Sequence, residues 1–112
     1  MSAMFELDMG GVGVMPDPDD NPGGHVNPHH EAGTRVSFQV TNVGDSDGNA
    51  RVGVEVDDVF VVEWASQNLV AGGSEVGYVS LGRLSQGSHT VLIYVNPGSG
   101  TADHQSNTFE VE

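Results

Sequence analysis

Three histidines and several acidic residues lie close together in one polar segment near the start of the chain. His25, His29 and His30 are followed directly by Glu31, and further acids precede them in PDPDDNPGG. Imidazole and carboxylate groups at this spacing can bind zinc, nickel or copper. The segment is also rich in glycine and proline, which is typical of a solvated loop. We therefore expect a long flexible polar loop over residues 16–33, in which the three histidines are the candidate ligands of a transition metal.

A second candidate cation site lies in the turn DSDGN. Asp45 and Asp47 offer carboxylates there, and calcium prefers six to eight oxygen ligands. An EF-hand loop is excluded because its last position, which needs a glutamate, is Val56. In a β-sandwich this turn would lie beside the penultimate loop, which brings Asp103 towards it. Asp45, Asp47 and Asp103 are the candidate calcium ligands, and the alternative is a turn whose Asp, Asn and Gly residues serve the backbone.

The sequence contains no arrangement of residues that is typical of a catalytic site. It has no cysteine and no G-x-S-x-G motif. Asp57 and Asp58 form an acidic pair, but they lie where a two-residue hairpin would turn. Trp64, Tyr78 and Tyr94 could stack on sugar rings if exposed, although the alternation around Trp64 predicts that it is buried. We therefore predict that the protein is not an enzyme and has no cofactor, with calcium as the alternative.

The charge of the chain is its strongest compositional feature. Sixteen acidic residues face three arginines and no lysine, for a formal net charge of -13. Such a surface repels phosphate backbones and anionic lipids, so we expect no nucleic-acid partner and no membrane insertion. It attracts divalent cations or basic partners, and it also keeps a protein soluble. The sequence has no apolar run long enough to span a membrane and shows no signal peptide at its start.

Alternating apolar and polar residues predict a series of short strands around one apolar segment. Residues 84–95, LSQGSHTVLIYV, run from a glycine turn into a stretch that is apolar on both faces, which indicates a central strand. The other expected strands are 35–41, 51–56, 59–64, 75–81 and 108–111, with an edge strand kinked by glycines over 4–15 and a polar loop over 97–107.

The predicted hairpin over residues 51–64 turns at Asp57 and Asp58. Its expected inward faces are Val52, Val54 and Val56 on the first strand and Phe60, Val62 and Trp64 on the second. Seven or eight short strands at this spacing predict a single all-β domain over 1–112, an antiparallel β-sandwich. A small closed β-barrel is the alternative.

Two motifs resemble those of the CARDB domains, immunoglobulin-like modules of bacterial and archaeal surface proteins. The first is F-x-V-x-N-x-G, formed by Phe38, Val40, Asn42 and Gly44, and the second is formed by Leu84, Gly87, His89 and Val91. The resemblance covers about residues 34–112. It departs from the family at the Asp57-Asp58 turn, at His89 where an aromatic residue is usual, and at the acidic ending, reduced to Asp103 and His104. It implies an immunoglobulin-like sandwich in an adhesion or spacer role without catalysis.

These features favour a non-catalytic immunoglobulin-like module of a larger bacterial or archaeal protein, extracellular or at the cell surface, that acts in adhesion, as a spacer or in protein interaction. Its expected partner is a protein, a cell surface or a carbohydrate. One alternative is a module that binds calcium, another metal or carbohydrate. A second alternative is a structural component of a phage or secretion assembly. The sequence leaves the oligomeric state open, although edge strands at each end could pair with another copy.

Overall fold

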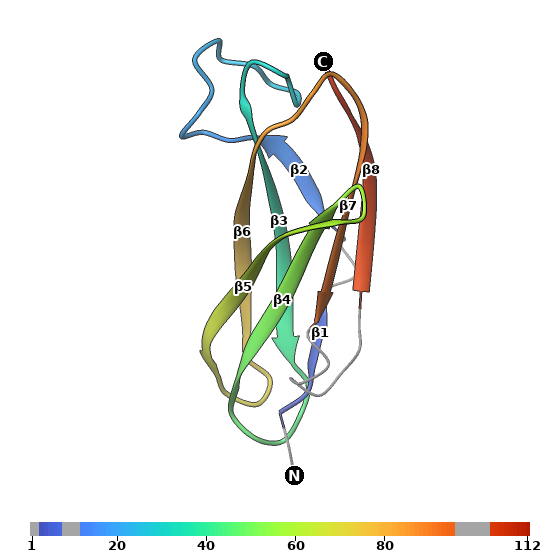
Figure 1. The fold of residues 1–112 in the computed structure, drawn as a ribbon. Coiled ribbons are helices and arrows are strands. Elements are labelled where there is room, and N and C mark those ends of the chain that lie inside the picture. The colour runs from blue at the N-terminus through green and yellow to red at the C-terminus, as the bar shows by residue number, and fades with distance from the viewer. Residues whose placement is uncertain (1–2, 8–11, 96–103) are drawn as a thin grey trace.

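The computed structural model describes residues 3–7, 12–95 and 104–112, and these residues form eight β-strands and no helix. The strands are β1 Phe5–Leu7, β2 Gly13–Pro16, β3 Gly33–Asn42, β4 Gly48–Val56, β5 Val59–Leu69, β6 Ser74–Arg83, β7 Gly87–Val95 and β8 His104–Val111. They form two antiparallel sheets packed face to face, so the fold is an immunoglobulin-like β-sandwich and not a closed barrel (Figure 1). The described ranges thus contain no helix that could cross a membrane.

The first sheet is built around β3. One edge of β3 pairs with β1 and then with β2, and its other edge pairs with β6. The predicted edge strand over 4–15 is therefore two short strands that follow the same edge of β3, and Gly10 and Gly11 of its expected kink lie outside the described residues. The second sheet has the order β5-β4-β7-β8. β7 thus has a neighbour on each side, as its apolar sequence predicts.

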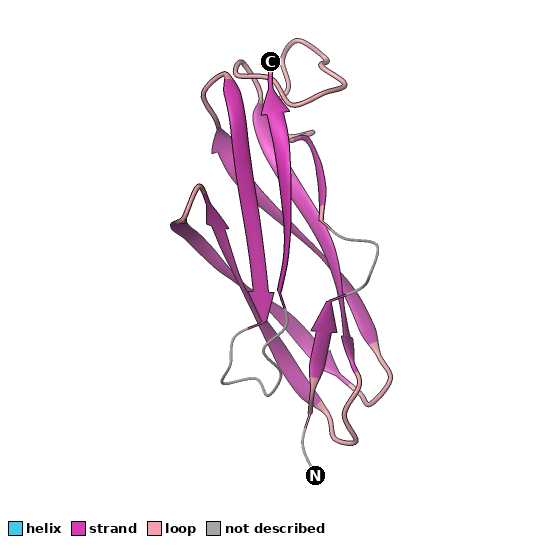
Figure 2. Cartoon of the chain, turned by 90° about the vertical axis from the view of Figure 1, so that its right-hand side faces the viewer, coloured by secondary structure: helices cyan, strands magenta, loops and turns pink. Residues whose placement is uncertain are grey.

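The strands run along the long axis of the molecule, with most of the turns near its two ends (Figure 2). The sandwich measures 48 × 24 × 21 Å. β1 begins near one end, and β8 finishes at the opposite end (Figure 1). The chain therefore enters and leaves this domain at opposite ends of its long axis.

The core lies between the two sheets and follows the predicted alternation on most strands. The inward residues of β3, β4 and β7 are almost completely buried: Val36, Phe38, Val40, Val52, Val54, Val56, Val91, Ile93 and Val95. Phe38 also packs edge to face on Trp64, with 5.2 Å between ring centroids. This contact depends on Gly77, because a Cβ there would lie 2.6 Å from Phe38 and 2.9 Å from Trp64. The two rings therefore fill the space that a larger residue on β6 would occupy.

The predicted inward face of β5 is wrong at its first half. Phe60 is 57% exposed and Val62 is 36% exposed, and Trp64 is only half-buried. Every residue from Val59 to Glu63 is exposed, whichever face of the strand it lies on, so neither face of this segment is covered by another layer. A β-bulge contributes as well, since Val54 pairs with Val62 and Glu55 with Phe60, which leaves Val61 without a partner on β4. Alternation indicates a strand but does not show how far the opposite sheet extends over it.

Strand boundaries also differ from the prediction at the end of the chain. Residues 104–107, expected in a polar loop, belong to β8 and pair with β7 from Val91 to Tyr94. Polar side chains are tolerated there because β8 is an edge strand with one side in solvent. The rest of the predicted loop, residues 97–103, lies outside the described residues.

Candidate functional site

The loop between β2 and β3 is held to the sandwich by hydrogen bonds to three elements. Asp17 and Gly33 pair through their backbones at 2.8 Å, and Ser80 on β6 donates to the Asp17 carboxylate at 2.8 Å. Arg83 donates to both oxygens of Asp20, at 2.7 and 3.0 Å, which lowers the pKa of Asp20. Glu112 at the end of the chain also pairs with this loop. Flexibility of residues 16–33 stays a prediction, but the loop has defined anchors at both of its ends.

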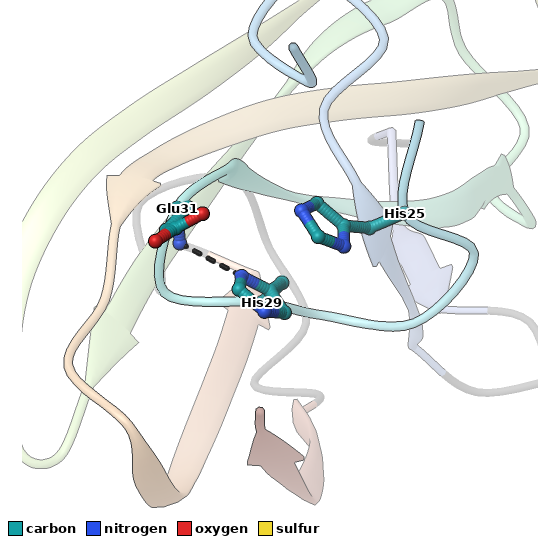
Figure 3. Close-up of side chains that lie close together, drawn as sticks. All are labelled: His25, His29 and Glu31. Carbon is teal, nitrogen blue, oxygen red and sulfur yellow. Dashed lines mark hydrogen bonds between the residues drawn. The ribbon is translucent and has the colours of Figure 1, made fainter. Parts of the chain in front are cut away.

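Two of the predicted histidines and a glutamate come together in this loop (Figure 3). One ligand atom from each of His25, His29 and Glu31 can be chosen so that all three atoms lie within 4.8 Å of one another. The two imidazole rings are stacked, with centroids 3.7 Å apart and planes only 9° from parallel. The Glu31 amide donates to Nδ1 of His29 at 3.0 Å. The structure therefore brings together the residue types that a transition metal requires.

His30, the third predicted ligand, lies next to this group but is bonded elsewhere. Its Nδ1 lies 2.8 Å from the backbone oxygen of Glu112, and its backbone amide donates to the same oxygen at 2.8 Å. A carbonyl oxygen only accepts, so Nδ1 of His30 carries the proton. Nε2 of His30 lies 3.8 Å from the Glu31 carboxylate, and the ring stacks on His29 at 4.6 Å. Its main role in this geometry is to join the loop to the last residue of the chain.

The predicted calcium ligands are only partly described. Asp45 and Asp47 are exposed in the turn between β3 and β4, and Asp103 lies outside the described residues. The turn itself is held by Asn42, whose side chain donates to the backbone oxygen of Ser46 at 2.8 Å and accepts from the Gly44 amide at 3.0 Å. A calcium site at Asp45, Asp47 and Asp103 stays a prediction.

The exposed aromatic residues do not form a flat sugar-binding platform among the described strands. Tyr78 is 54% exposed on the outer face of the first sheet, but the Arg35 guanidinium lies 4.5 Å above its ring centroid. Tyr94 is half-buried and lies over Gly53 of the neighbouring strand, where a Cβ would be 2.3 Å from its ring. Each ring is therefore already in contact with a protein group on one face, and carbohydrate binding stays a prediction.

A serine, a histidine and an aspartate meet in an order that resembles a hydrolase triad. His89 Nδ1 donates to the Asp57 carboxylate at 2.6 Å, and Nε2 lies 3.4 Å from the Ser85 hydroxyl. Nε2 lies closer, at 2.7 Å, to the backbone oxygen of Ser85. Because that carbonyl only accepts, Nε2 donates to it in this geometry and does not offer a lone pair to the Ser85 hydroxyl. His89 therefore joins the β4–β5 turn to the β6–β7 turn.

The Asp57–His89 pair should make stability depend on pH. The hydrogen bonds that His89 donates to Asp57 and to the Ser85 carbonyl raise the pKa of His89. The hydrogen bonds that Asp57 accepts from the Thr90 amide and from His89 lower the pKa of Asp57. The stability that His89 contributes is complete below its unfolded pKa of about 6.5 and is lost as pH rises through its folded pKa. The stability that Asp57 contributes is complete above its unfolded pKa of about 3.8 and is lost as pH falls through its folded pKa. The pair therefore stabilises the fold most between the two unfolded pKa values, about 3.8 and about 6.5.

We expect His89→Gln to reduce the difference in melting temperature between about pH 5.5 and pH 8. Thermal unfolding at the two pH values measures this difference. The high net charge also changes stability with pH, so His104→Gln, at an exposed histidine on β8, is the control. An equal reduction in both variants would show that general charge, and not the Asp57 pair, causes the pH dependence.

The first half of β5 is a feature that the sequence analysis missed. Among the described strands, β5 lies at the edge of its sheet and pairs with β4 alone. Its residues Val59, Phe60, Val61 and Val62 are 65%, 57%, 41% and 36% exposed. The sequence does carry a signal for this feature, namely four consecutive apolar residues directly after a hairpin turn. A strand that is covered on one face normally alternates apolar and polar residues instead. The result is an open strand edge with apolar side chains on both of its faces.

Comparison with known proteins identifies the fold but no close relative. No protein-family model matches the sequence, and no curated protein matches it. Among solved structures, the CARDB domain of a Pyrococcus furiosus protein matches with a TM-score of 0.60 and 15% identity, over 100% of this chain and 96% of that chain. This chain has a CARDB-like fold, which confirms the fold that its motifs predict.

Two larger enzymes also contain a similar domain. A β-glucosidase from Erythrobacter marinus matches with a TM-score of 0.68 and 16% identity over 98% of this chain. A GH2 β-galacturonidase from Eisenbergiella tayi matches with a TM-score of 0.65 and 10% identity over 95% of this chain. The chain spans only 16% and 18% of the lengths of these two enzymes. At this identity the likeness concerns the fold alone.

Proposed function

We propose that this chain is a non-catalytic module of a longer surface or secreted protein, and that it binds a protein partner along the open edge of β5. The observation that carries the proposal is the exposed apolar segment from Val59 to Val62 on a strand that has a partner strand on one edge only among the described residues. Edge strands in soluble proteins are usually shielded by charged residues, proline, a β-bulge or a covering loop, because their free backbone groups pair readily with another strand. The bulge at Val61 leaves the apolar side chains on either side of it exposed. β5 contains neither lysine nor proline. A partner strand would pair with its free backbone groups and cover its apolar side chains.

The charge around this edge favours a basic partner over a second copy. The apolar segment lies beside Glu55, Asp57 and Asp58, and it is followed by Glu63, whose carboxylate lies 3.2 Å from the Arg51 guanidinium. Two copies with a net charge of -13 each would bring these acidic rims together. A strand with apolar centre residues and lysine or arginine at its ends would complement both parts of the surface. The expected partner is therefore such a strand, from another protein or from a neighbouring domain.

The shape of the sandwich supports a spacer role in addition. β1 begins near one end of the long axis and β8 finishes at the other (Figure 1). Domains joined in series through such ends would lie in a row. The share of each matched chain that this chain covers also supports a module within a longer protein. This chain covers nearly the whole of the CARDB domain but less than a fifth of each of the two glycosidases.

Site-specific photo-crosslinking tests the β5 contact. A photoreactive phenylalanine analogue at Phe60 should crosslink to one discrete species in the cells that produce the protein. The same analogue at Tyr78 is the control, because Tyr78 is equally exposed but lies on the outer face of the first sheet. No discrete adduct from Phe60, or the same adduct from both positions, would contradict a specific interface at β5.

A further inference from the structure

We propose that His25, His29 and Glu31 form a binding site for a divalent transition metal, with zinc as the best-suited ion. This site is independent of the β5 edge, because it lies in the loop between β2 and β3. Two imidazoles and one carboxylate are a donor set that zinc accepts, with the remaining coordination position left for water. The three ligand atoms already lie within 4.8 Å of one another before any ion is bound. Closing this group around an ion therefore needs only local movement of side chains.

The backbone on either side of the two histidines is fixed by specific hydrogen bonds. The Asn21 side chain accepts from the His25 amide at 2.9 Å and donates to the His25 carbonyl at 2.8 Å. Gly23 leaves room for the His25 ring, because a Cβ there would lie 2.5 Å from Nε2. The carbonyl of His29 accepts from the Ala32 amide at 3.0 Å, which closes a turn that carries Glu31. The loop thus holds the ligands near one another, so less chain entropy is lost when an ion binds.

Binding requires two changes in the histidine rings. An imidazole binds a metal in the plane of its own ring, so the nearly parallel rings of His25 and His29 must turn apart around a shared ion. Since Nδ1 of His29 accepts the Glu31 amide, the neutral ring carries its proton on Nε2. The ion therefore takes Nδ1 in place of that hydrogen bond, or it takes Nε2 after the ring proton has moved to Nδ1, which also breaks that hydrogen bond. Both rings are only half-buried, which leaves room for this rotation.

The charge of the protein and the type of ligand select the ion. A net charge of -13 attracts any cation to the surface. Imidazole, however, favours zinc, copper and nickel, whereas calcium takes oxygen ligands and needs six to eight of them. A zinc site at this position is therefore distinguished from general cation attraction by its preference for zinc over calcium.

Calorimetric titration of the whole chain, stripped with EDTA, tests the site with zinc chloride and with calcium chloride. We expect one zinc ion per chain near pH 7, a melting temperature raised by several degrees in excess zinc, and no comparable effect of calcium. Equal responses to zinc and calcium, or no response to zinc, would overturn the proposal.

Single substitutions identify the ligands. Removing a residue that only orients a metal ligand weakens metal binding by about 10–100-fold, and removing a direct ligand should weaken it at least as much. His25→Gln, His29→Gln and Glu31→Gln should therefore each weaken zinc binding at least tenfold. His104→Gln and Asp47→Asn, at an exposed histidine and an exposed acid outside the loop, should leave zinc affinity within about twofold. A weakening from His30→Gln as large as that from His29→Gln would instead assign the site to the three histidines and overturn the set proposed here.

Discussion

Asn42→Asp should destabilise the domain by about 3 kcal/mol or more, a large part of the free energy of unfolding of a domain this size. Asn42 is completely buried, and its amide nitrogen donates to the backbone oxygens of Ser46 at 2.8 Å and Leu69 at 2.9 Å. Its side-chain oxygen accepts from the amides of Gly44 at 3.0 Å and Met4 at 3.3 Å. One residue thereby joins the N-terminal segment, the β3–β4 turn and the end of β5. A carboxylate of the same shape places an oxygen against two carbonyl oxygens and buries a charge.

Denaturant unfolding of the wild type and the variant measures this loss. Asn49→Asp is the matched control, since Asn49 is exposed at the far side of the same turn and makes one side-chain bond, to the Ser66 carbonyl at 3.1 Å. We expect the control to lose about 1 kcal/mol or less. Similar losses in the two variants would show that the buried position of Asn42 is not what ties these segments together.

Phe38→Ala should destabilise the domain by about 3–5 kcal/mol, whereas Phe60→Ala should change its stability by no more than about 0.5 kcal/mol. Phe38 is 3% exposed and packs on Trp64 above Gly77, so its loss leaves a cavity between the sheets. Phe60 is 57% exposed at the open edge of β5. The pair is instructive because both residues are phenylalanines in strands, and the sequence predicts that both point inward.

The same unfolding measurement compares the two alanine variants under identical conditions. A comparable loss from Phe60→Ala would mean that another layer covers the first half of β5 in solution, and it would remove the basis for an interface there. A small loss from Phe38→Ala would mean that the Trp64 side of the core repacks around the missing ring.

The sequence predicts the sandwich well because its core strands are covered on one face by the opposite sheet. Val36, Phe38 and Val40 alternate with polar residues, and the structure buries all three. The hairpin turn is also predictable, since Asp57 and Asp58 tolerate the positive φ angles of 52° and 68° that a tight turn requires. The motif residue Asn42 is recognisable in the sequence as well. Its four hydrogen bonds are not, because their partners are backbone groups from three separate segments.

The candidate sites are less predictable because they depend on how far one layer covers another and on how a loop folds back. Phe60 and Val62 fit an inward pattern, but the opposite sheet does not reach them. His25, His29 and His30 lie close together in the sequence, yet the loop groups the first two with Glu31 and turns the third towards Glu112. The contact between Ser85, His89 and Asp57 joins two turns that only the folded sheet brings together. Each of these outcomes is set by tertiary contacts rather than by local spacing.

The central claim is that the open edge of β5 accepts an apolar strand with basic ends. An NMR titration of the labelled domain tests it with a nine-residue peptide of alternating valine and threonine that has lysines at both ends. Two control peptides carry glutamates at the ends, or keep the lysines and contain a central proline that prevents strand pairing. We expect amide shifts confined to Val59–Glu63 with the first peptide and none there with either control. Shifts elsewhere only, or the same shifts with the proline peptide, would contradict it.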